Sequence, residues 1–198
     1  TGATAIAKSY ASGADSFAAA ITNNGSSYGA TGANGVAIGQ LAKAGSAGQS
    51  VAIGGSCIAS GTSSIAISGY FASATGSGSL AIGQYAAASG INSISIGYRS
   101  KANTQGKIAL SAGATSGIGS GAGHQQRGIY ILKGATTDAT QKVLTGLGNT
   151  ADASNSWVLE NNASHAFSGT VIARQDGTDG DDYAAWEVKG AVMRADTA

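Results

Sequence analysis

The chain has 198 residues and a mass of 19.1 kDa, with 32 glycines and no proline. Charged residues make up 11%, against about 25% in an ordinary globular domain, so the chain lacks the charge that keeps disordered proteins solvated. The formal net charge of +1 favours neither nucleic-acid nor membrane partners, and no run approaches the roughly 20 apolar residues of a membrane-spanning helix. The single cysteine excludes an intrachain disulfide. Because the chain starts at Thr1 without methionine or a signal peptide, we expect it to be a piece of a longer protein.

An aliphatic–Ala–Ile–Gly motif recurs along the first 113 residues. Its central positions include 37, 52, 66, 81, 95 and 109, which are 14 or 15 residues apart. Such a period predicts a solenoid, in which each repeat forms one coil. The aliphatic positions are the expected structural core of the repeat: Val36, Ile38, Val51, Ile53, Ile65, Ile67, Leu80, Ile82, Ile94, Ile96, Ile108 and Leu110.

Each repeat has a second half with small residues at alternate positions, as in Ala42-Lys43-Ala44. Since successive side chains of a strand point to opposite faces, Val51 and Ile53 share one face and Ala52 takes the other. We expect a parallel β-solenoid of about 14 residues per coil with aliphatic residues on one inner wall and alanines on the opposite wall. Alanines that point outward from the aliphatic strand would let neighbouring chains approach closely.

The Ser-Val-Ala-Ile-Gly pattern of residues 50–54 and its copies resembles the head repeats of trimeric autotransporter adhesins of the YadA type. The resemblance covers about residues 1–113 and implies a left-handed parallel β-roll in which three chains associate side by side. Phage tail fibres use a similar roll. A homotrimer also has a physical reason, because a repeat unit cannot bury its own apolar face alone.

Two corner residues follow each aliphatic strand, and stacked coils would place them in one column. In three successive coils this column contains aromatic residues: Tyr70, Phe71, Tyr85 and Tyr98. An exposed aromatic column suits glycan or surface binding. The alternative is that the same rings shield the edge of the roll or fill a subunit junction.

The composition changes near residue 113. We expect a glycine-rich neck at residues 114–127 and a truncated antiparallel β-domain at residues 128–198. Five strands are predicted there, and the last two, 165–174 and 183–194, form a long hairpin. Residues 159–174 and 184–190 resemble a β-domain that recurs in phage tail fibres and other virion proteins, which favours a virion protein over a bacterial adhesin.

The search for catalytic and metal-binding chemistry finds weak candidates only. Cys57 takes the place of an alanine of the other repeats, so we expect a small buried residue rather than a nucleophile. The acidic loop could bind Ca²⁺, but a solvated hairpin tip is the favoured interpretation; its acids are Asp176, Asp179, Asp181 and Asp182. No catalytic residue, metal site or cofactor is therefore predicted.

These observations predict a structural and adhesive protein of a homotrimeric phage tail fibre or similar virion appendage. Its partners would be two further copies of the chain, a glycan or protein receptor on the host surface, and other tail proteins, with no nucleic acid and no membrane insertion. The first alternative is the head of a bacterial trimeric autotransporter adhesin, located on the bacterial surface. The second alternative is a polysaccharide-degrading tailspike, which would need paired carboxylates, whereas residues 1–113 hold one acid, Asp15.

Overall fold

The computed structural model describes residues 2–20, 25–45, 48–111, 126–136, 141–146, 148, 150–157, 159, 163–174 and 183–195. The chain divides into two compact units, Thr1–Trp157 and Val158–Ala198. Its described elements are strands, and the described residues include no helix with the length and apolarity needed to cross a membrane.

The first unit is a β-solenoid, which confirms the fold predicted from the 14-residue period. One sheet has nine strands in spatial order: β1 (Thr4–Ala7), β2 (Phe17–Ala20), β4 (Val36–Ile38), β6 (Val51–Gly55), β8 (Ile65–Tyr70), β10 (Leu80–Ile82), β12 (Ile94–Gly97), β14 (Ile108–Ser111) and β15 (Arg127–Ile129). The opposite sheet has six shorter strands: β3 (Gly29–Ala30), β5 (Lys43–Ala44), β7 (Ile58–Ala59), β9 (Ser73–Ala74), β11 (Ala87–Ala88) and β13 (Lys101–Ala102).

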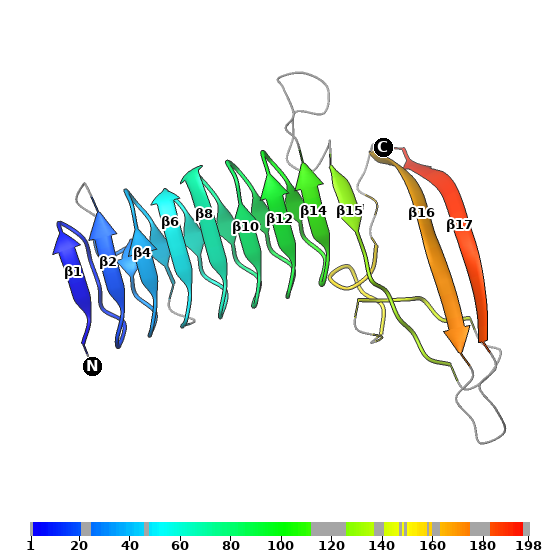
Figure 1. The fold of residues 1–198 in the computed structure, drawn as a ribbon, viewed down its shortest axis with the longest axis horizontal. Coiled ribbons are helices and arrows are strands. Elements are labelled where there is room, and N and C mark those ends of the chain that lie inside the picture. The colour runs from blue at the N-terminus through cyan, green and yellow to red at the C-terminus, as the bar shows by residue number, and fades with distance from the viewer. Residues whose placement is uncertain are drawn as a thin grey trace. The chain divides into compact units, whose positions relative to one another are not determined.

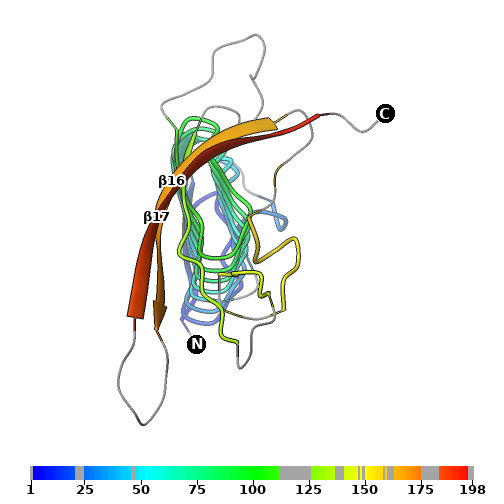
Figure 2. The same ribbon diagram turned by 90° about the vertical axis from the view of Figure 1, so that its right-hand side faces the viewer.

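Equivalent residues of successive coils pair with one another. Ala52 pairs with Ala37 on one side and with Ala66 on the other, and all strand pairs from β1 to β14 are parallel. The coils stack in a row (Figure 1), and viewed along the stack they overlie one another as narrow, flattened loops (Figure 2). Every repeat position therefore forms a column along the solenoid.

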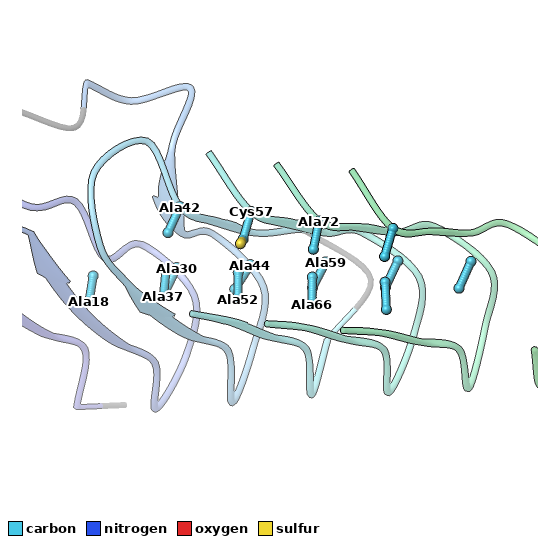
Figure 3. Packing of buried hydrophobic residues seen from close by; sticks show 14 residues of the cluster. Ala18, Ala30, Ala37, Ala42, Ala44, Ala52, Cys57, Ala59, Ala66 and Ala72 are labelled. Carbon is cyan, nitrogen blue, oxygen red and sulfur yellow. The ribbon is translucent and has the colours of Figure 1, made fainter. Parts of the chain in front are cut away.

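The interior of the solenoid contains alanine columns from both sheets. Every buried hydrophobic side chain of the described residues is alanine, with one exception, Cys57. Figure 3 shows the methyl groups of the two sheets meeting between the layers. Serines that precede the aliphatic strands also point inward, and Ser50, Ser64, Ser79 and Ser93 are buried.

The expectation that the aliphatic residues fill the core is wrong. Val36, Val51, Ile53, Leu80, Ile94 and Ile108 are half-buried, and Ile38, Ile65, Ile67, Ile82, Ile96 and Leu110 are 36–39% exposed. They form the outer face of the nine-stranded sheet, while the alanines between them point inward. The two short corners of a 14-residue coil bring the sheets so close that the interior has room only for methyl-sized and hydroxymethyl side chains.

Gln126, β15 and Ser154 bind the exposed edge of the last coil of the solenoid. The strand β15 runs antiparallel to β14, with Ile129 opposite Ile108. The Gln126 amide imitates a further strand on the other sheet, because the Lys101 amide N–H donates to its Oε1 at 2.7 Å and its Nε2 donates to the Lys101 carbonyl at 2.9 Å. The Gln105 N–H donates to the Ser154 carbonyl at 2.7 Å. The open edge of the last coil is thus hydrogen-bonded, as terminal repeats of solenoids require.

The second unit contains one antiparallel hairpin. Its strands are β16 (Ala163–Arg174) and β17 (Tyr183–Arg194), paired from Ala163–Arg194 to Arg174–Tyr183. This hairpin confirms the last two predicted strands, whereas the described residues of the other three strands expected in residues 128–198 form no sheet with it. Part of that segment is β15 of the solenoid sheet, and Lys133 and Thr145 form an isolated bridge. Most of the neck predicted at residues 114–127 lies outside the described residues.

Candidate functional site

The candidate site lies at the corner that follows each strand of the nine-stranded sheet. The second corner residue has a positive φ in five coils: Leu41 (54°), Ser56 (54°), Phe71 (52°), Tyr85 (59°) and Arg99 (54°). Backbone bonds between coils hold these residues in register; the Phe71 N–H donates to the Gly55 carbonyl at 2.9 Å, and the Arg99 N–H donates to the Gln84 carbonyl at 2.9 Å. The corners therefore form a ladder of their own, which stacks their side chains in a column.

The structure brings the four predicted aromatic side chains together in this column. The ring centroids of Tyr70 and Phe71 lie 4.2 Å apart, those of Tyr70 and Tyr85 6.0 Å apart, and those of Phe71 and Tyr85 5.7 Å apart. Tyr98 continues the row, with its ring centroid 6.1 Å from that of Tyr85. We call Tyr70, Phe71, Tyr85 and Tyr98 the aromatic stripe. Tyr70, Phe71 and Tyr85 are 46%, 41% and 39% exposed, and Tyr98 is half-buried.

A basic side chain belongs to the same column. The guanidinium carbon of Arg99 lies 5.6 Å from the ring centroid of Tyr85 and 5.4 Å from that of Tyr98. These distances are within the range of cation–π attraction. Arg99 follows Tyr98 at the same corner, but its place against two rings depends on the corner geometry, which the sequence pattern does not show.

An irregular coil creates a hollow beside the stripe. Two residues, Ser68 and Gly69, separate Ile67 from the corner residue Tyr70, where the neighbouring coils have one residue, and the pairing of β6 with β8 shifts at this point. The resulting open hollow has a volume of about 760 Å³; its lining includes Ile53, Ile67, Ile82, Ser68, Gly69, Tyr70 and Gln84. It connects the aliphatic outer face with the aromatic stripe.

The structure places another predicted candidate, Cys57, in the interior of the solenoid. Cys57 is buried as expected, in a column with Ala42, Ala72 and Ala86, and its Sγ lies 3.4 Å from the Ser68 carbonyl oxygen. The acidic loop of Asp176, Asp179, Asp181 and Asp182 lies outside the described residues. Among the residues that the structure does describe, no group of three or more His, Cys, Asp or Glu side chains could hold a metal ion.

The comparison with protein families agrees with the architecture of the solenoid. The family model of the YadA head domain repeat matches residues 30–56, 59–86 and 88–106. Searches among curated proteins and among solved structures gave no match. The matched segments cover the solenoid from β3 to β13, including the coils that carry the aromatic stripe. Residues 30–106 therefore match the YadA head domain repeat, as the sequence pattern predicts.

Proposed function

We propose that the chain is part of a homotrimeric surface-attachment fibre, in which three solenoids associate through their aliphatic outer faces. The observation that carries this proposal is the position of the aliphatic side chains, two columns of which lie on the outside of the nine-stranded sheet. A continuous apolar surface of this kind marks an interaction site. It holds no charged residue at the repeat positions of β4–β14, so copies of the same face can pack together without like-charge repulsion.

The surface proposed for subunit contact is the aliphatic outer face and not the alanine face expected from the sequence. The sequence analysis assigned the subunit contact to outward alanines, whereas these alanines are inside the coil. Burial of the aliphatic columns between subunits would add to the apolar area that the alanine interior already buries, and burial of apolar area is the main favourable term in association. The homotrimer is also what the resemblance to YadA-type heads implies.

The favoured setting is a phage tail fibre or similar virion appendage that attaches the particle to its host. The resemblance of residues 159–174 and 184–190 to a tail-fibre β-domain supports this choice. Sites repeated on three chains would gain avidity through their high effective concentration. The aromatic stripe is the candidate contact with a glycan or protein receptor of the host surface, and other tail proteins would bind the rest of the chain.

The second candidate is the head of a bacterial trimeric autotransporter adhesin, which the YadA head domain repeats support equally well. We propose no catalytic activity and no cofactor in either setting; the first 113 residues hold a single acid, Asp15, and the other nine acids lie in residues 114–198. A tailspike depolymerase would instead release reducing sugars from the host capsule. That assay on the purified chain gives a clear signal for a depolymerase and none for an attachment protein.

Light scattering before and after heating in detergent tests the assembly. We expect a mass of three times 19.1 kDa that persists in detergent, whereas a stable monomer would contradict the proposal. Binding of the labelled trimer to bacterial cells and to surfaces coated with animal matrix proteins then separates the two settings. A virion fibre binds the bacterial cells, and an adhesin head binds the matrix.

A further inference from the structure

We propose that the aromatic stripe binds a carboxylated saccharide and that Arg99 selects the carboxylate. The inference rests on the proposed attachment function and adds the chemical class of the ligand. The site would consist of the rings of the stripe together with the guanidinium group of Arg99, which lies against two of these rings.

The rings offer what a saccharide needs for packing. Three of the four are about two-fifths exposed or more, and their centroid spacings of 5.7–6.1 Å between coils extend the surface across successive coils. Tyrosine combines an apolar ring with a polar hydroxyl group, so the exposed Tyr70 and Tyr85 can pack against the C–H face of a pyranose while their hydroxyl groups bond sugar oxygens, and Phe71 adds an apolar ring. A chain of sugars can therefore contact several coils at once.

The charge of the solenoid favours an acidic sugar over a neutral one. Residues 1–113 contain five basic side chains, Lys8, Lys43, Arg99, Lys101 and Lys107, against one acidic side chain, Asp15. Arg99 is the basic residue whose cation lies at the stripe. A guanidinium binds a carboxylate through two parallel charge-assisted hydrogen bonds, and the two rings beside Arg99 restrict its side chain, so that less freedom is lost on binding.

The corner conformation does not depend on an aromatic side chain. Phe71 and Tyr85 adopt φ values of 52° and 59°, and Leu41, Ser56 and Arg99 adopt 54° at the same corner. This left-handed conformation is a property of the repeat, and asparagine tolerates it. The fold therefore does not need an aromatic ring there, and a ring can be replaced by asparagine in a test.

Three soluble probes separate saccharide recognition from simple attraction between charges. They are the hexamer of galacturonic acid, the same hexamer fully methyl-esterified, and hexaglutamate. By calorimetry on the intact chain, we expect the acidic hexamer to bind at least about tenfold more tightly than its ester, as the loss of a charge-assisted hydrogen bond predicts. Hexaglutamate, which has carboxylates without sugar rings, should bind at least about tenfold more weakly than the acidic hexamer.

Two variants and two matched controls assign the residues. Arg99→Gln should reduce the affinity for the acidic hexamer to that for the ester. Tyr85→Asn should weaken both hexamers, and it is expected to fold because asparagine tolerates the left-handed corner. Tyr10→Asn removes a 37% exposed tyrosine outside the stripe, and Lys43→Gln removes a cation of another coil; both controls should bind like the parent chain.

The outcomes distinguish this inference from the proposed function. Three results would overturn the inference: the acidic hexamer binds no more tightly than its ester, it binds no more tightly than hexaglutamate, or it does not bind. In each case a trimeric mass would still support the fibre. A Tyr85→Asn variant that dissociates the trimer would show that the stripe is a subunit junction and would also overturn it. A monomeric parent chain contradicts the fibre itself, whatever it binds.

Discussion

Two neighbouring alanines of β11 test which face of the solenoid is packed. Ala88 is fully buried and pairs with Ala74 and Ala102, whereas Ala87 is half-buried in a column that elsewhere contains Lys43, Ile58 and Lys101. We expect Ala88→Val to lower the free energy of unfolding by about 1–3 kcal/mol, because extra methyl groups overpack the thin interior. Ala87→Val should change it by less than about 0.5 kcal/mol. Denaturant titration followed by circular dichroism measures both, and equal losses would contradict the alanine core.

The sequence determines which residues share a face but leaves open which face is inside. Alternation placed Val51 and Ile53 together and Ala52 opposite them, and this pairing is correct. The usual rule that large apolar residues are buried then assigned the wrong side, because the thin interior of the coil has room only for small side chains and the aliphatic side chains lie on its outer face. The width of the interior depends on the corners, where residues such as Ser56 and Phe71 adopt positive φ, and residue type alone does not predict that.

At the scale of the coil, a glycine column sets how closely neighbouring coils approach. A Cβ atom on Gly76 would lie 2.1 Å from the carbonyl oxygen of Gly90 in the next coil, whereas a Cβ on Gly69, in the same coil as Gly76, has no atom within 4 Å. We expect Gly76→Ala to lower the free energy of unfolding by about 3 kcal/mol or more, since the clash is with backbone, and Gly69→Ala to be within about 0.5 kcal/mol of the parent. Thermal unfolding of the two variants measures the difference in stability. If Gly76→Ala is as stable as the parent chain, neighbouring coils can move apart to make room for the added methyl group.

The end of the solenoid shows why this column needs glycine. The equivalent position of the last coil is Thr104, which has a full side chain, and beside it the Gln105 N–H binds the Ser154 carbonyl instead of another coil. The repeat pattern predicts the coils up to this point because each residue type recurs at the equivalent position of the next coil. The cap made by Gln126 and β15 was not predicted, because its contacts join residues far apart in sequence and occur only once.

The hairpin of the second unit was predictable for a local reason. Polar and apolar residues alternate along both strands, and a loop of turn-forming residues joins them. The two strands are therefore neighbours in the sequence, and their pairing can be predicted from that segment alone. The face with Phe167, Trp186, Val188 and Val192 is apolar, and these side chains are 37–51% exposed. A two-stranded hairpin is marginally stable alone. Burial of this apolar face would therefore stabilise the hairpin, as burial of the aliphatic outer face would stabilise the solenoid.

At the scale of the whole molecule, two isoleucines of one coil separate the proposed subunit contact from the free surface. Ile53 belongs to the aliphatic outer face, and Ile58 points outward from the opposite sheet; both are half-buried. In a trimer, Ile53→Asp places a carboxylate of each subunit in an apolar interface, where burial of an unpaired charge costs several kcal/mol. We expect this variant to lose the trimeric mass in light scattering.

The matched variant Ile58→Asp adds the same charge to the same coil at a position that neighbouring coils fill with lysine and serine. It should keep the mass of the parent chain. Loss of the trimer in both variants would show that the carboxylate damages the coil rather than the interface, and retention in both would exclude the aliphatic face as the contact. If Ile53→Asp alone dissociates, the outward aliphatic residues act as the core of the assembly, which explains why each coil can rely on an interior of alanine.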